Sequence, residues 1–257
     1  MTPENQINAV VESAIVTRPA GASGIVLVCE HASNHFPETF GGLGLDDTVR
    51  GSHAAWDPGA LAVAEHLSEM LEAPLVAGGV SRLIYDCNRP PEAASAIPER
   101  SEAFDIPGNI GLSAESKQRR ARQIYDPFHA TVSELLDETH AQVIITVHSF
   151  TRVYLGKTRD VEVGVLHDAD SRLADAMLEI AGDHTSLLVA RNQPYGPGDG
   201  VMHTLKRHGV GRGIPHVMLE MRNDLIATPK DQKDIAAMLA GWLKQALASV
   251  VPDTSRA

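Results

Sequence analysis

Three apolar segments of the sequence each run directly into a side chain that can bind a metal ion or transfer a proton. The three side chains are His31, His148 and Glu220, which follow residues 24–30, 142–147 and 215–219. In an open parallel α/β sheet the carboxyl ends of the strands share one edge, and ligands bind just beyond that edge. We therefore expect the three side chains to converge on one site.

The residue types at this edge are those of a catalytic zinc site. Two imidazoles and one carboxylate, with a fourth position open to water, form a common zinc shell. Asp57 can supply the carboxylate if the helix that it opens starts at the same edge. We predict one zinc ion per chain, held by His31, Asp57 and His148, although iron, cobalt or nickel also suits these donors. Glu30, the residue before His31, is a candidate for orienting an imidazole.

Glu220 and three arginines are predicted to carry the remaining chemistry. Zinc lowers the pKa of a bound water towards about 7, and Glu220 would accept the proton as the water attacks a carbonyl carbon. Arg82, Arg89 and Arg222 would neutralise the oxyanion and any carboxylate of the substrate. Glu220 and Arg222 are two residues apart, so they share one side of an extended strand. Metal-assisted hydrolysis is the predicted reaction, with Glu220 and Arg82 as catalytic residues.

Each of these residues also has a structural interpretation. A single histidine at the end of a strand usually makes a structural hydrogen bond, and an aspartate before a proline usually caps a helix. Two arginine–carboxylate pairs could be structural or surface ion pairs, namely Glu220–Arg222 and Arg82–Asp86. Other histidines are interpreted as solvent-facing or structural, namely His35, His53, His203 and His208. The coincidence of several candidates at one sheet edge favours the metal site.

The elements that must position these residues alternate between strands and helices. Further strands are predicted at residues 74–77, 80–86, 161–166 and 186–190, and helices at 57–71, 113–140, 169–183, 200–208 and from 228 onward. Pro127 is expected to kink the second helix. The alternation predicts one α/β domain with a largely parallel sheet. Residues 1–23 are predicted to form a peripheral arm, and the loop 90–111 to be a lid or disordered.

Composition narrows the classes of function. The 257-residue chain has a net charge of −11 at pH 7 and 4% aromatic residues, which argues against a nucleic-acid or anionic-membrane surface. The sequence shows neither a run of 18 apolar residues nor a signal peptide, so we expect a cytoplasmic protein that does not span a membrane. The two cysteines, Cys29 and Cys87, are expected to be core thiols.

The chemistry-bearing segments occur in a recognisable order. The set VLVCEHASNHFP, WDPGA, SRLIYDCNRP, ITVHSF, YGPGDGVMHTLKRHG and IPHVMLEMRNDL resembles the N-formylglutamate amidohydrolase family over about residues 24–245. That family is similar to zinc carboxypeptidases and N-acetylmuramoyl-L-alanine amidases, and the resemblance implies a three-layer, phosphorylase/hydrolase-like α/β fold. It also implies that His31, Asp57 and His148 bind zinc and that Glu220 is the catalytic glutamate.

The resemblance implies hydrolysis of a small N-acyl amino acid, such as N-formyl-L-glutamate to formate and L-glutamate. The substrate-binding residues that it implies, together with the arginines, are Arg89, Asn88, Arg222, Tyr195, Asp199 and Thr204. Family members that act in histidine breakdown carry His-Ser-Gly at the first site, whereas this chain has His31-Ala32-Ser33-Asn34, which looks like a divergent branch. The alternatives are a peptidoglycan-type amidase or carboxypeptidase, and a non-catalytic, metal-containing binding module.

Overall fold

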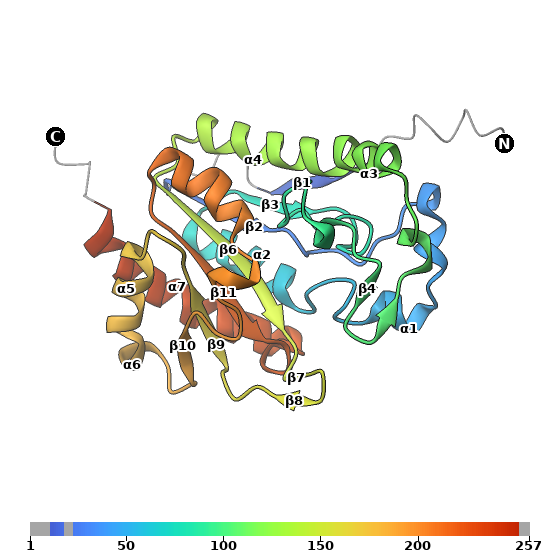
Figure 1. Ribbon diagram of the computed structural model, residues 1–257. Helices are drawn as coiled ribbons and strands as arrows, with labels where there is room; N and C mark the ends of the chain where they lie inside the picture. Colours follow the sequence, from blue (N-terminus) through green and yellow to red (C-terminus); the bar gives the residue numbers. More distant parts are fainter. Residues whose placement is uncertain (1–10, 18–22, 252–257) are drawn as a thin grey trace.

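In the computed structural model, which describes residues 11–17 and 23–251, the apolar runs form a mostly parallel seven-stranded sheet with helices on both faces (Figure 1). This confirms the predicted fold class. The strands, in the order in which they lie across the sheet, are β1 (Ala14–Thr17), β3 (Leu75–Gly78), β2 (Ile25–Cys29), β6 (Val143–Phe150), β11 (His216–Arg222), β9 (Val163–Leu166) and β10 (Val189–Arg191). The helices are α1 (Asp47–Gly51), α2 (Ala60–Leu71), α3 (Ala114–Arg120), α4 (Asp126–Glu138), α5 (Arg172–Glu179), α6 (Ala181–His184) and α7 (Pro229–Val250).

The three central strands run in the same direction. β2 pairs with β6 and β6 with β11 in parallel ladders, and Glu220 is the partner of His148 in the second ladder. Because these strands are parallel, their carboxyl ends lie at one edge of the sheet. β9 pairs with β11 in the antiparallel sense, so His167, which follows β9, belongs to the opposite edge.

Both faces of the sheet are buried, as in other parallel sheets. Alternate residues of β2 show this: Leu27 and Cys29 pack in the core formed with α2, α5 and α7, whereas Val26 and Val28 pack in the core beneath α4. Both cysteines are free and buried, as expected. Successive side chains of a strand point to opposite faces of the sheet, so a strand between two helical layers needs apolar residues at every position, and β2 has them.

The N-terminus of α7 has a side-chain cap, whereas that of α2 has none. The Thr228 hydroxyl accepts a hydrogen bond from the Asp231 N–H at 3.2 Å, so α7 begins as predicted. In contrast, α2 begins at Ala60 after Gly59, whose φ is 82°. Asp57 therefore does not cap this helix, and its carboxylate is available for the site.

Several predicted elements differ from the structure. The predicted strand at 80–86 is a series of buried turns, in which the Ser81 hydroxyl donates to the Ala55 carbonyl at 2.8 Å. The predicted helix at 113–140 consists of α3, a π-helical turn at Ala121–Tyr125 and α4. Such turns are a common cause of helix bends. The predicted helix at 169–183 is divided into α5 and α6. The predicted helix at 200–208 is shorter and contains a π-helical turn at Leu205–Gly209.

The predicted loop 90–111 and the predicted arm 1–23 both contain short strands. Within 90–111, β4 (Arg100–Ser101) and β5 (Phe104–Asp105) form a hairpin, and a second hairpin is formed by β7 (Val153–Tyr154) and β8 (Lys157–Thr158). Part of the predicted arm at 1–23 is β1, an edge strand antiparallel to β3. The remainder of that arm, residues 1–10 and 18–22, lies outside the described residues.

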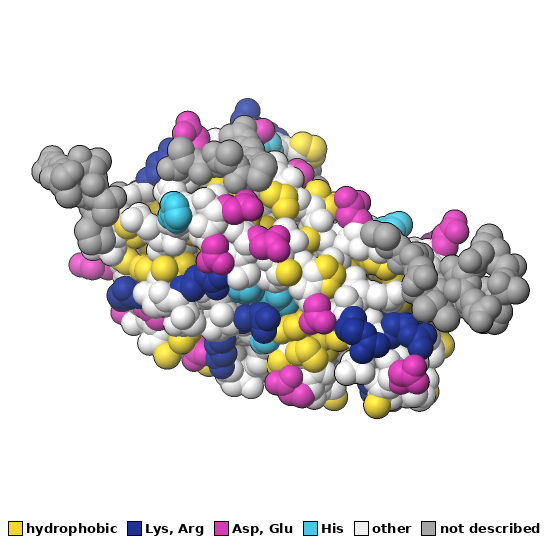
Figure 2. Space-filling model, turned by 90° about the horizontal axis from the view of Figure 1, so that it is seen from above, with side chains coloured by type: hydrophobic (Ala, Val, Ile, Leu, Met, Phe, Trp, Pro, Cys, Tyr) yellow, Lys and Arg dark blue, Asp and Glu magenta, His cyan; other side chains and the backbone are white. Residues whose placement is uncertain are grey.

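The surface over α3 and α4 carries charges of both signs. Viewed from above, acidic and basic side chains are interspersed with hydrophobic ones on this face (Figure 2). Among residues 11–17 and 23–251, none of the helices combines the length and the apolar character needed to cross a membrane.

Candidate metal centre and active site

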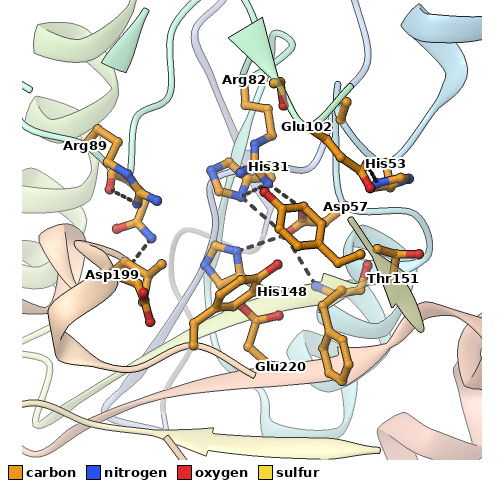
Figure 3. Close-up of a pocket in the computed structure, with 18 residues that line it drawn as sticks. His31, His53, Asp57, Arg82, Arg89, Glu102, His148, Thr151, Asp199 and Glu220 are labelled. Atoms are coloured by element: carbon orange, nitrogen blue, oxygen red, sulfur yellow. Dashed lines mark hydrogen bonds and ion pairs between the residues drawn. The ribbon is translucent and has the colours of Figure 1, made fainter. Parts of the chain in front are cut away.

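A cavity of about 310 Å³ opens at the carboxyl ends of the central strands (Figure 3). His31 follows β2, His148 lies in β6 and Glu220 lies in β11, and all three side chains line the cavity. β3 ends beside the turn after β2, and this close approach is possible because Gly78 has no side chain. A Cβ at this position would lie 2.0 Å from the Glu30 carbonyl oxygen. Parallel register thus brings the three side chains together.

Asp57 lies between the two imidazoles. Its Oδ2 is 3.3 Å from His31 Nδ1 and 3.0 Å from His148 Nδ1, and one ligand atom of each residue lies within 4.8 Å of the others. The backbone fixes the aspartate, because its N–H donates to the His31 carbonyl at 2.9 Å and the Ser149 N–H donates to Oδ2 at 3.3 Å. Two imidazole nitrogens and a carboxylate oxygen, all buried and facing one point, are a donor set that suits zinc.

A second carboxylate lies behind each imidazole. His31 Nε2 is hydrogen-bonded to Asp86 Oδ1 at 2.8 Å. Glu30 Oε2 is 3.0 Å from His148 Nε2, which is an ion-pair distance without hydrogen-bond geometry. In metal sites such carboxylates orient the ring so that its other nitrogen faces the ion. The residues present therefore fit a divalent transition metal.

In this cluster, the charges of neighbouring side chains outweigh the effect of burial on each pKa. Burial would raise the pKa of Glu30, but the charge of His148 overrides it and brings that pKa to about 2. Burial would also raise the pKa of Asp57, which proximity to His31 holds well below its usual range. Burial would lower the pKa of His148, but the Glu30 charge raises it well above its usual value. A metal ion would balance the same carboxylates in place of the imidazole protons.

Arg82 lies beside this triad of His31, Asp57 and His148. Its Nη1 donates to Asp57 Oδ1 at 3.0 Å, and its Nη2 is 3.9 Å from Asp86 Oδ2. The side chain is 30% exposed, so the guanidinium reaches both the buried cluster and the cavity. Asp86 is buried, and the surface-pair interpretation of Arg82 and Asp86 is therefore wrong.

Glu220 lies at the cavity with an unpaired carboxylate oxygen. Its Oε2 is buried without a hydrogen-bond partner among the described residues. Burial raises the pKa of Glu220 to about 7, although the nearby His148 charge opposes this rise. A carboxyl group that titrates near neutrality and borders a cavity can take up and release a proton during a reaction.

Four of the predicted substrate-binding residues line the cavity, namely Asn88 and the three side chains of Arg89, Asp199 and Tyr195. Arg89 donates through Nη1 to the Asn88 carbonyl at 2.9 Å, and Asp199 accepts a hydrogen bond from a backbone N–H of its own turn. The Tyr195 hydroxyl accepts from Arg159 at 3.0 Å, and that guanidinium also lies over the Tyr195 ring. These contacts leave further polar atoms of the three side chains for a ligand.

Asn88 and Thr204 support the cavity wall through hydrogen bonds to each other and to the backbone. Asn88 Nδ2 donates to the Val201 carbonyl at 2.6 Å, and its Oδ1 accepts from the Thr204 N–H at 3.1 Å. Asn88 borders the cavity, but its amide is engaged in holding residues 201–204. Thr204 is fully buried and does not line the cavity.

Arg222 does not reach the cavity, contrary to the sequence prediction. Its Nε donates to Asp224 at 2.7 Å and its Nη2 to Glu162 at 3.2 Å. β11 ends at this residue, and the following turn supplies the aspartate that draws the guanidinium away. The two-residue spacing from Glu220 was therefore an insufficient guide to side-chain direction at a strand end.

The wall formed by Glu102, His53 and Tyr154 was outside the predicted site. Glu102 comes from the hairpin within the long 90–111 segment, and His53 had been interpreted as structural. The signal that could have found Glu102 was the length of that segment, because long loops in compact domains are often functional. Nothing in the spacing of His53 or Tyr154 indicated the cavity.

Comparisons with known proteins found one matching family model and solved structures with a similar fold. A model of N-formylglutamate amidohydrolase matches residues 23–227. A solved structure of a gene product from Agrobacterium tumefaciens is 50% identical, with a TM-score of 0.91 over 97% of this chain and 98% of that one. The structure of N-formylglutamate amidohydrolase from Ralstonia eutropha has the same fold, at 18% identity and a TM-score of 0.63 over 91% of this chain and 99% of that one. A search of curated proteins found no match.

Proposed function

The chain belongs to the N-formylglutamate amidohydrolase family, and we propose that it uses a bound divalent metal ion to hydrolyse the amide bond of a small N-acyl amino acid. The observation that carries this proposal is the convergence of His31, Asp57 and His148 with Glu220 in one cavity. The reaction would add water across the amide C–N bond. It would release a carboxylic acid, which is formate for an N-formyl substrate, and the free amino acid.

His31, Asp57 and His148 would hold the metal, and zinc matches two imidazoles and a carboxylate well. Such an ion, when bound, makes water more acidic and polarises a carbonyl group. Asp86 and Glu30, behind the two rings, would keep each imidazole turned towards the ion.

Glu220 would carry the proton through the reaction. Its carboxylate would accept a proton from the attacking water and return it to the departing amine nitrogen when the C–N bond breaks. Burial raises the pKa of Glu220 to about 7, which favours uptake of a proton by this carboxylate. Its unpaired Oε2 leaves room for the proton.

Arg82 and Arg89 would bind the anionic parts of the reacting molecule. The Arg82 guanidinium lies next to Asp57, where it would stabilise negative charge on the former carbonyl oxygen. Arg89 lies farther along the wall (Figure 3) and would bind the α-carboxylate of the substrate. A cavity of about 310 Å³ suits a molecule of this size.

Replacement of Glu220 by glutamine tests the proposal. We expect kcat/KM for an N-formyl amino acid to fall at least about a hundredfold, because the proton acceptor is lost. Metal content should stay near that of the wild type, since Glu220 is not one of the three donors. Formate release and elemental analysis on the same preparations measure both effects.

Glu138→Gln provides a matched control, because Glu138 is an exposed residue at the end of α4. This variant should keep the wild-type rate. Full activity of the wild type after complete removal of metal by a chelator would contradict the proposal, and so would an unchanged rate in Glu220→Gln.

A further inference from the structure

Arg159 is held against the cavity wall by aromatic rings, and the described residues include no acidic partner for it. The central carbon of its guanidinium lies 4.5 Å from the centroid of the Tyr154 ring and 4.8 Å from that of the Tyr195 ring. The Phe150 ring is 5.8 Å away, and all three rings belong to residues that line the cavity. In the described part of the chain, no carboxylate oxygen lies within 4.0 Å of the Arg159 nitrogens. The aromatic faces attract the positive charge but do not neutralise it.

The Arg159 guanidinium keeps donor groups for a ligand. Its Nη1 donates to the Tyr195 hydroxyl at 3.0 Å and to the Thr151 carbonyl at 3.5 Å. Its Nε and Nη2 make no hydrogen bond to the described residues, and both are open to solvent. A half-buried guanidinium with free N–H groups and no counter-ion can bind a carboxylate through two parallel hydrogen bonds.

The β7–β8 hairpin positions Arg159 and also contacts Glu102, the acidic residue of this wall, through other donors. Glu102 Oε2 is 2.7 Å from His53 Nε2, and its Oε1 accepts a hydrogen bond from the Leu155 N–H at 3.1 Å. Leu155 lies in the turn of the hairpin, and Arg159 follows β8. The Arg159 N–H donates to the Arg152 carbonyl at 2.8 Å, which closes the base of the hairpin. The backbone therefore fixes Arg159, while both oxygens of the nearby carboxylate are engaged elsewhere.

We infer that Arg159 binds the side-chain carboxylate of the substrate and so selects N-acyl derivatives of an acidic amino acid. The inference rests on the proposed function. In Figure 3, Thr151, whose carbonyl accepts from Arg159, lies on one side of the triad and Arg89 on the other. With the amide bond at the triad and the α-carboxylate at Arg89, the side chain on the α-carbon is directed to the wall of Arg159. The guanidinium lies just beyond the lining residues, so it meets a group that extends to the edge of the cavity. Because stacking fixes the guanidinium plane, less freedom is lost when a carboxylate binds its edge.

N-formylglutamate and N-formylglutamine provide a direct test, since they are nearly isosteric and differ in side-chain charge. We expect the wild-type kcat/KM to be at least about tenfold higher for N-formylglutamate. Arg159→Met keeps an unbranched chain between the rings but removes the charge and the donors. It should reduce the ratio to within about threefold, mainly by raising KM for N-formylglutamate. Arg152→Gln removes an exposed positive charge directly before β7 and should leave the ratio unchanged.

Arg159→Lys provides a second test, because lysine keeps the charge without the planar pair of donors, and its ratio should lie between those of the wild type and Arg159→Met. If Arg159 only holds Tyr195 in place, Arg159→Met should lower kcat/KM equally for both compounds, and that unchanged ratio would overturn the inference. A wild-type preference for N-formylglutamine would overturn it as well, while formate release upheld the proposed function. Formate release from neither compound by the wild type would contradict the proposed function, and the inference with it.

Discussion

Three buried carboxylates share two imidazoles at the centre of the site. His31 lies between Asp57 and Asp86, and His148 lies between Asp57 and Glu30. Burying an uncompensated carboxylate costs several kcal/mol, so this arrangement is stable only with positive charge among the groups. Arg82 supplies part of that charge to Asp57 and Asp86, and imidazole protons or a divalent ion can supply the rest. The demand for a cation is therefore a property of these side chains, whatever substrate the cavity accepts.

Activity should depend on pH through Glu220. Burial raises the pKa of Glu220 to about 7, and a bound cation would lower it again. A general base acts in its deprotonated form, so kcat/KM should rise with pH through an apparent pKa at or below about 7. Rates measured from about pH 5 to about pH 9 check this, and the rise should be absent from any residual activity of Glu220→Gln. Activity that increases on acidification would exclude Glu220 as the base.

Metal affinity should depend on Asp86. Its carboxylate accepts the hydrogen bond from His31 Nε2 and so leaves Nδ1 free to face the metal. In Asp86→Asn that orientation is weakened, and we expect zinc affinity to fall by about 10- to 100-fold. Competition with a chromogenic chelator measures the change. Asp105→Asn, in an exposed hairpin pair, is the control, and equal affinities of the two variants would remove Asp86 from the metal site.

At the scale of elements, the irregular segment 90–111 depends on one buried hydrogen-bond network. Asn109 is fully buried, and its Nδ2 donates to the Leu83 carbonyl at 2.8 Å and to the Pro98 carbonyl at 2.7 Å. Its Oδ1 accepts from Arg120 at 2.6 Å. These bonds tie the segment to α3 and to the turns before it, and so hold the β4–β5 hairpin at the cavity wall.

Asn109→Ala should therefore destabilise the protein. The substitution removes the Nδ2 donor from two buried carbonyls and takes one acceptor from the Arg120 guanidinium, which keeps its bonds to the Ile84 and Gly108 carbonyls. We expect a cost of about 2–4 kcal/mol in the free energy of unfolding. Urea denaturation followed by circular dichroism measures the loss. Gln118→Ala, on the exposed side of α3, should change the free energy by less than about 0.5 kcal/mol. If Asn109→Ala lowered the free energy of unfolding as little as Gln118→Ala, other contacts would be holding the segment in place.

At the scale of the whole molecule, the sequence was most informative where long apolar runs form parallel strands. β2, β6 and β11 are such runs, and the shared edge of parallel strands was enough to predict that His31, His148 and Glu220 converge. The predicted strand at 80–86 was wrong because Leu83 and Ile84 are buried in turns, a state that local periodicity does not distinguish from a strand.

Residues placed by turns could not be predicted in the same way. Asp86 lies behind His31, to which it is hydrogen-bonded across 55 residues of sequence, and Glu102 lies on the cavity wall, where it pairs with His53 across 49 residues. The prediction that Arg222 lines the site was wrong because the turn after β11 supplies Asp224, which directs the guanidinium away from the cavity. Side chains at the ends of regular elements, and those in loops, therefore required the structure.

Metal binding should stabilise the entire fold, because the three donors come from the end of β2, the segment before α2 and β6, which lie far apart in the sequence. An ion that binds only the folded state at about 100 times its Kd adds about 2.7 kcal/mol. For a chain of this length, zinc should then raise the melting temperature of chelator-treated protein by about 5–10 °C. Calorimetry measures the shift, which Glu138→Gln should retain and His148→Ala should lose. A shift of equal size in His148→Ala would mean that zinc stabilises the protein from another site.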